Sequence, residues 1–280
     1  TFPDSKVNST SKIYDTPSGD CDVVSFTLAG HPFMAISAGP PFTFNPSVSF
    51  MVACATKDEV DDLWKKLNEG GKALMPLDSY PFSERYGWTE DRYGLSWQIS
   101  YAGDTPVAQT ITPSMLFVGD VAGKAGEAID LYTSIFPDSG VENIFRYGPG
   151  QEPEREGTVM FGSFKLCGQE FAAMDSANAD HNFAFNEAIS LMVSCEDQAE
   201  IDRYWDALSA VPEAEQCGWL KDRFGLSWQI VPKAMDEMMG KGTSEQQARV
   251  TQAFLQMKKF DLAALQRAYD GAQEPVGGST

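Results

Sequence analysis

The clearest hydrophobic pattern in the chain is a short segment that occurs twice, at 91–99 and at 222–230, with Tyr93 and Phe224 as the only difference. In each copy an Asp and a Gly predict a tight turn, and the alternation of apolar and polar residues that follows predicts a strand. Successive strand side chains point to opposite faces. One face is therefore apolar, and the other carries Ser96 and Gln98 in the first copy and Ser227 and Gln229 in the second.

A second repeated pattern, at 42–52 and 183–193, indicates that the chain is duplicated. Each copy contains Phe-x-Phe-Asn and runs into a predicted helix that begins with a capping-box pattern. The capping residues are Thr56 with Glu59, and Asp197 with Glu200. Apolar residues then recur at helical spacing and predict core-facing stripes, formed by Val60, Leu63, Trp64 and Leu67 and by Ile201, Tyr204, Trp205 and Leu208.

Two predicted hairpins, at 23–37 and 159–175, also correspond to one another. The second copy has in addition a predicted strand at 111–118 and an amphipathic helix, which Asp120 is expected to cap. The first copy has no counterpart of this strand and helix. Two interpretations stay open: a cloning or processing boundary, or a half that is open on one side.

The repeats predict three parts: a first domain at 1–105 without its opening strand and helix, a complete second domain at 106–235, and C-terminal helices with a tail at 236–280. In the third part Ser244 and Gln247 form a capping-box pattern. Asp261 is expected to cap a last helix that ends at Gly271.

Composition excludes several partners. The net charge of −19 disfavours nucleic acid and anionic membrane surfaces, and no apolar run approaches the length of a membrane span. The five cysteines form no CxxC pair, which favours reduced thiols in an intracellular, cytoplasmic protein. Cys54 and Cys195 fall at equivalent repeat positions, where a packing role is expected.

A doubled βαβββ unit that ends in Asp-x-Phe-Gly-x-x-Trp-Gln-Ile resembles the PhnB-like branch of the vicinal-oxygen-chelate superfamily. That superfamily includes glyoxalase I, extradiol dioxygenases and bleomycin-resistance proteins. The resemblance implies an α+β fold, in which tandem βαβββ modules form curved mixed sheets. Some relatives carry a 3-demethylubiquinone-9 3-methyltransferase-like label. Methyltransferase activity is not expected, because the sequence has no glycine-rich strand-to-helix loop for a cofactor.

The resemblance also implies where a divalent metal would be held, on the first and last strands of the modules. The last-strand carboxylate position falls on Gln98 and Gln229, and the opening-strand positions fall on or beside Pro113 and Ala188. Pro and Ala have no ligating side chain, and a Gln amide is a weak neutral donor. We therefore predict no cofactor, with a weakly bound divalent metal as the alternative.

Several polar and aromatic residues are candidates for ligand binding. Asp175 and Gln229 form the most site-like pair, and Ser227 and Gln98 share their strands' polar faces. Asn45 and Asn186 are pocket amides or, by the favoured interpretation, turn-forming residues. Trp88 and Trp219 line the site or pack in the core.

Three functions remain open. The first is a protein that binds an unidentified small molecule without a metal, and the second is a glyoxalase-type lyase, isomerase or dioxygenase with a rearranged site. The third is a non-catalytic dimerisation module, in which the two copies form an intrachain pseudo-dimer or the chain forms a homodimer.

Overall fold

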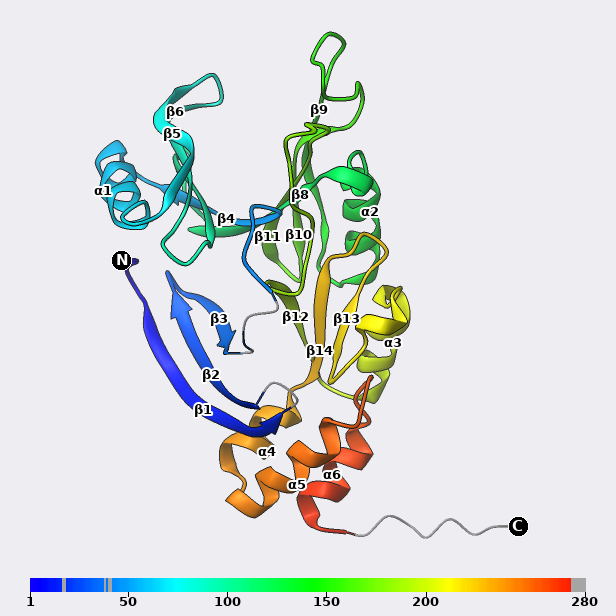
Figure 1. Cartoon of the computed structure of the whole chain (residues 1–280). Coiled ribbons are helices and arrows are strands. Elements are labelled where there is room, and N and C mark those ends of the chain that lie inside the picture. The colour runs from blue at the N-terminus through cyan, green and yellow to red at the C-terminus, as the bar shows by residue number, and fades with distance from the viewer. Residues whose placement is uncertain (17–18, 38, 40–41, 273–280) are drawn as a thin grey trace. The chain divides into compact units, whose positions relative to one another are not determined.

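The structure is a computed structural model that describes residues 1–16, 19–37, 39 and 42–272 (Figure 1). Residues 273–280, most of the predicted tail, lie outside these residues. The chain divides into two compact units: unit 1 comprises 1–12 and 21–188, and unit 2 comprises 13–20 and 189–280. These units do not follow the sequence repeats, so the division at 105 and 235 stays a prediction about the duplication.

Unit 1 contains a mixed sheet of eight strands among the described residues, in the order β5-β6-β7-β4-β8-β11-β10-β9. Two βαβββ modules build it, as the sequence predicts. The first consists of β4 (Val48–Cys54), α1 (Lys57–Leu67), β5 (Lys72–Tyr80), β6 (Ser83–Glu90) and β7 (Ser96–Tyr101). The second consists of β8 (Ile111–Phe117), α2 (Ala125–Ile135), β9 (Gly140–Arg146), β10 (Val159–Leu166) and β11 (Gln169–Asp175).

The two modules join where β4 of the first repeat pairs antiparallel with β8 of the second, with Val48 opposite Met115 and Val52 opposite Ile111. Within each module the opening strand pairs in parallel with the closing strand, β4 with β7 and β8 with β11. The helices α1 and α2 pack on one face of the sheet. The opposite face is therefore the one that the helices leave open.

The beginning of α1 follows its sequence pattern closely. Thr56 Oγ1 accepts the Glu59 N–H, and Glu59 Oε2 accepts the Thr56 N–H, so both arms of the capping box form. The helix presses its Trp64 ring against Gly87 of β6, where an added Cβ would lie 2.4 Å from the ring. Only glycine allows this close approach of helix and strand.

Three strands precede the large sheet: β1 (Lys6–Thr16), β2 (Gly19–Leu28) and β3 (His31–Ile36), in a sheet of that order. The β2–β3 hairpin is the predicted counterpart of β10–β11. Phe26 and Phe33 stack with ring centroids 5.7 Å apart, as the equivalent Phe164 and Phe171 do at 5.9 Å. The ring stack repeats because the cross-strand pairing repeats.

Unit 2 contains β12 (Ser190–Cys195), α3 (Gln198–Leu208), the short helix η2 (Pro212–Ala214), β13 (Trp219–Lys221) and β14 (Ser227–Pro232). Their sheet has the order β12-β14-β13. Three strands after the helix were predicted here, and that is wrong for the described residues: η2 and the short β13 stand where the first repeat has the β5–β6 hairpin. The helices α4 (Ala234–Lys241), α5 (Ser244–Phe254) and α6 (Leu262–Asp270) follow.

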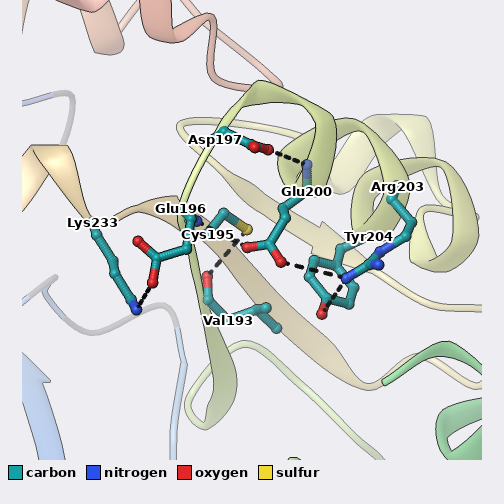
Figure 2. A network of polar contacts seen from close by, with 8 residues as sticks. All are labelled: Val193, Cys195, Glu196, Asp197, Glu200, Arg203, Tyr204 and Lys233. Carbon is teal, nitrogen blue, oxygen red and sulfur yellow. Dashed lines mark hydrogen bonds and ion pairs between the residues drawn. The ribbon is translucent and has the colours of Figure 1, made fainter. Parts of the chain in front are cut away.

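The start of α3 shows how the second repeat varies the capping box (Figure 2). Asp197 accepts the Glu200 N–H at 3.0 Å, as predicted, but the Glu200 carboxylate accepts the N–H of Glu196 instead of that of the cap residue. Glu200 also lies 3.6 Å from Arg203, and Glu196 pairs with Lys233. The first turn of the helix is thus fixed by charged side chains on both sides of the cap.

Of the three remaining predicted caps, two are wrong and one is confirmed. The capping box of α5 forms between Thr243 and Gln246, one residue before the predicted pair. Asp120 does not cap α2; it lies in the short helix η1 (Gly119–Val121), and the residue before α2 makes no side-chain cap. Asp261 caps α6, which ends at Gly271 in the left-handed conformation.

Candidate functional site

The aspartate of the repeated segment has a structural role in both copies. Asp222 Oδ1 accepts the N–H groups of Phe224 and Leu226 at 2.9 and 3.1 Å, and Oδ2 accepts the Trp228 indole N–H at 2.9 Å. Asp91 makes the same three contacts, ending at Trp97. The carboxylate thus ties the turn to the strand, which explains why Asp and Trp recur at a fixed spacing.

The polar face of the first copy forms a closed network on the open side of the unit 1 sheet. Gln98 Nε2 donates to Ser49 Oγ at 2.6 Å, and the Tyr86 hydroxyl donates to Gln98 Oε1 at 2.8 Å. Trp88 donates its indole N–H to Ser96 at 2.8 Å. Gln98 is 5% exposed, so these protein contacts replace its water. Burial raises the pKa of Tyr86, which keeps its hydroxyl protonated and donating.

The second copy places the same residue types in unit 2 but leaves the network open. Gln229 Nε2 donates to Ser190 Oγ at 2.8 Å, and Trp219 lies opposite Gln229 in the β13–β14 pair. Among the described residues no hydrogen bond reaches Gln229 Oε1. Ser227 is 1% exposed, and its hydroxyl has no hydrogen-bond partner in the described part of the chain. A buried hydroxyl without a hydrogen-bond partner is energetically unfavourable.

The difference between the copies has a backbone cause. The first copy's donor, Tyr86, sits within β6, two residues before Trp88. The aligned residue of the second copy is Cys217, which lies in a turn with a φ of 51°, before the short β13 begins. A cysteine in this turn does not replace the tyrosine hydroxyl, and no described residue donates to the amide oxygen of Gln229.

The residues at the superfamily's metal positions do not fit a divalent ion. The oxygen and the nitrogen of the Gln98 amide are hydrogen-bonded to Tyr86 and Ser49. The neighbours of Gln229 on its face of the sheet are Ser190, Ser227 and Met192. Over the described ranges, no three His, Cys, Asp or Glu side chains converge. The donor set is hydroxyl, amide and thioether, which a hard or borderline cation binds poorly.

Comparison with known proteins identifies the family. The family model for 3-demethylubiquinone-9 3-methyltransferase matches residues 1–100 and 109–231. The chain belongs to this family. The two matched regions are the two sequence repeats, so the predicted duplication is confirmed. Comparison with curated proteins finds no match.

Solved structures agree with this assignment. A PhnB protein from Bacillus cereus is 40% identical over 36% of this chain and 82% of its own, with a TM-score of 0.33. A protein from Staphylococcus aureus is 30% identical over 44% of this chain and 95% of its own, with a TM-score of 0.19. Glyoxalase I from Zea mays is 10% identical over 82% of this chain and 84% of its own, with a TM-score of 0.51, and this likeness shows the fold alone. The vicinal-oxygen-chelate fold inferred from the sequence is thus confirmed.

In this family member the two Phe-x-Phe-Asn segments bind each other. Asn45 Nδ2 donates to the Ala184 carbonyl at 3.0 Å, and Asn186 Nδ2 donates to the Thr43 carbonyl at 2.9 Å. Each amide oxygen accepts a backbone N–H two residues further on, from Ser47 or Ala188. The asparagines therefore shape their own turns and bridge the repeats reciprocally, as two residues related by a pseudo-two-fold would.

Asp175 lies on the helix side of the unit 1 sheet. Its Oδ1 accepts the N–H groups of Gly123 and Ala125 at 2.8 and 3.0 Å, and its Oδ2 accepts that of Val159 at 2.8 Å. Burial raises the pKa of Asp175, while these three backbone donors lower it. Asp175 thus supplies the cap that Asp120 was expected to give α2, and its contacts are those of a structural carboxylate.

Three partners in the polar networks were missed by the sequence reasoning. Ser49 and Ser190 hold the glutamine amides, and their repeated Ser-x-Met-Val context was a signal that could have identified them. Tyr86 carried no such signal, because its contact with Gln98 depends on the pairing of β6 with β7.

None of the helices in the described part of the chain has the length and apolar character that crossing a bilayer requires.

Proposed function

We propose that this protein binds a small molecule on the face of the unit 2 sheet that carries Gln229 and Ser227, without a metal ion. The supporting observation is the contrast between the repeats. The oxygen and the nitrogen of this amide are both hydrogen-bonded in the first copy, whereas in the second copy no described residue donates to the oxygen. Next to it, the buried Ser227 hydroxyl lacks a partner among the described residues.

The side chains around these groups define what such a ligand would offer. Trp219 and Met192 flank Gln229 on the neighbouring strands, and Met192 is 40% exposed. An aromatic ring and a thioether suit an apolar or planar body. Gln229 Oε1 accepts a hydrogen bond, so the ligand would present an N–H or O–H group beside that body. Such a mixture of apolar surface and few polar groups is typical of ligand sites.

A fragment screen by ligand-observed NMR tests the proposal, with the double variant Gln229→Ala/Ser227→Ala as the comparison. We expect fragments that bind the wild type to lose at least about tenfold in affinity, because two polar contacts are removed. The double variant Gln98→Ala/Ser96→Ala is the matched control, since it removes the same side chains from the closed network. If fragments bind both double variants with the affinity that they have for the wild type, the proposal is wrong.

A second candidate role is a structural module in which the two repeats act as an internal pair. The reciprocal bridge between Asn45 and Asn186 favours it, because two copies of one motif satisfy each other. A chain of this kind stays monomeric in sedimentation across a wide concentration range. If the module instead dimerises, the sedimentation coefficient rises with concentration.

We do not adopt the enzyme alternatives. The glyoxalase-type alternative paired Gln229 with Asp175, whose carboxylate is engaged by three backbone N–H groups. The methyltransferase of the family description would need a cofactor loop that the sequence pattern does not provide. A cytoplasmic location remains part of the proposal, and the absence of a CxxC pair among the five cysteines of the sequence supports it.

A further inference from the structure

The β5–β6 hairpin distinguishes the first repeat from the second, and a hollow lies at its tip. Residues 80–84 and 101–103 line this hollow, which has a volume of about 300 Å³. That volume is at the lower end of the range for small-molecule sites. The hairpin has no counterpart in unit 2, where η2 and β13 take its place. The hollow is therefore a feature of the first repeat alone, distinct from the face of Gln229.

Aromatic rings dominate the hairpin tip. Tyr80 and Phe82 stack with ring centroids 5.6 Å apart, and Phe82 meets Tyr86 edge-on at 5.0 Å. Phe82 is nevertheless 67% exposed. Tyr86 is anchored from below by its hydrogen bond to Gln98. A rigid support thus presents ring surface to solvent.

The rim of the hollow already holds an ammonium group. Lys57, the first residue of α1, places Nζ 5.5 Å from the centroid of the Tyr101 ring and 2.6 Å from Glu84 Oε2. Tyr101 and Glu84 both line the hollow. A ring face and a carboxylate attract cations, and ammonium groups are the usual partners of such a pair. The Lys57–Glu84 pair is exposed on both sides, so a competing cation can replace it at little cost.

Among the other charges near the tip, the Arg85 guanidinium repels a cation at the position of Lys57. Asp61 pairs with Arg85 at 2.6 Å and offsets its charge. Asp78 of β5 lies opposite Tyr86 and adds a negative group to the hairpin. The net charge of −19 further favours the approach of positive ligands.

We propose that the hollow at the β5–β6 tip binds small organic cations, alkylammonium groups that take the place of the Lys57 ammonium against Tyr101 and Glu84. The cation's apolar substituents would rest on the rings of Tyr80 and Phe82. This site does not depend on the proposed function of Gln229, and the two sites share no residue.

Choline and its neutral analogue 3,3-dimethylbutan-1-ol are the probes, because they have nearly the same shape and differ in charge. Titration is followed by NMR of the trimethylammonium and tert-butyl signals with the full chain. We expect choline to bind saturably in the millimolar range and the alcohol at least about threefold more weakly. Equal binding of the two probes, or no saturation by choline, would overturn the proposal.

Variants of opposite sign sharpen the test. Phe82→Ala and Glu84→Gln should each weaken choline binding about two- to fivefold, because each removes one attractive partner. Lys57→Gln should strengthen it by a similar factor, because the built-in competitor is lost. Tyr93→Ala is the control: this tyrosine is 77% exposed at the other turn, outside the hollow. Weaker choline binding by Lys57→Gln would show that the lysine does not compete for the site.

Discussion

Replacing Asp175 tests whether its carboxylate has a structural role or a ligand-binding role. In Asp175→Ala, the N–H groups of Gly123, Ala125 and Val159 lose their acceptor, and the site is too buried for water to replace it, since Asp175 is 2% exposed. Hydrogen bonds to a charged group contribute roughly 1.5–3 kcal/mol each. Three such losses predict a destabilisation of about 4 kcal/mol or more, after the strands and helix relax.

The conservative change gives a graded comparison. Asp175→Asn keeps an amide oxygen for the two N–H groups at the start of α2 but points an NH₂ group at the Val159 N–H. One hydrogen bond is lost, so we expect a cost of about 1–2 kcal/mol. The two substitutions should therefore rank in the order of contacts removed.

Hydrogen exchange of the peptide that contains α2 is the most direct assay. The chain has two compact units, so a single unfolding curve would mix their transitions, whereas exchange reports the helix itself. Asp130→Ala is the matched control, because it removes an exposed carboxylate from the same helix and should change protection by less than about 0.5 kcal/mol. If Asp175→Ala retains α2 protection within about 1 kcal/mol of the wild type, the carboxylate does not hold the helix.

Three further predictions follow from other contacts. Asp222→Asn should reduce the hydrogen-exchange protection of the peptide that contains β14 by about 1–2 kcal/mol, and by more than Asp91→Asn reduces that of the β7 peptide, because Asp222 is buried and Asp91 partly exposed; equal losses would contradict this. Asn45→Ala and Asn186→Ala should couple by at least about 0.5 kcal/mol in a double-mutant cycle, whereas strict additivity would show that the two hydrogen bonds of the bridge act independently. Burial raises the pKa of Cys54 to about 11 and that of Cys195 to about 12. Mass spectrometry should therefore find the exposed Cys167 alkylated first at pH 8, and both buried thiols should react faster as the pH rises. Early labelling of Cys54 would refute this order.

The fold could be predicted because its signals are local and repeated. The stripe of Val60 and Leu63 becomes the buried face of α1. The alternation around Trp228 becomes β14, in which the buried Trp228 and its neighbour Gln229 point to opposite faces of the sheet. Where two residues offer the same chemistry, sequence reasoning loses precision. Thr243 and Ser244 are both good caps, and the structure uses the first.

The parts that could not be predicted depend on contacts between distant segments. The pairing of β4 with β8 joins the two repeats, and no local pattern specifies that partner. Asp175 is the last residue of β11, and Met174 before it points to the other face, so its position alone did not say which side carried its partners. The N–H groups that it binds come from two segments about 15 and 50 residues away, which is information that only the folded chain holds.

The duplication offers a physical reason why the two glutamines differ. A buried amide must have its oxygen and its NH₂ group satisfied, and the first repeat achieves this with a tyrosine that the β5–β6 hairpin places above Gln98. The second repeat has only a short β13 after a turn at Cys217, and Gln229 there is half-buried instead of buried. The hairpin thus does two things in the first repeat: it closes the polar network and presents the exposed rings of its tip. Under the proposed function, the copy with the closed network is the rigid one and the other copy keeps polar groups for a ligand. This division of roles requires no change in the repeated motif itself.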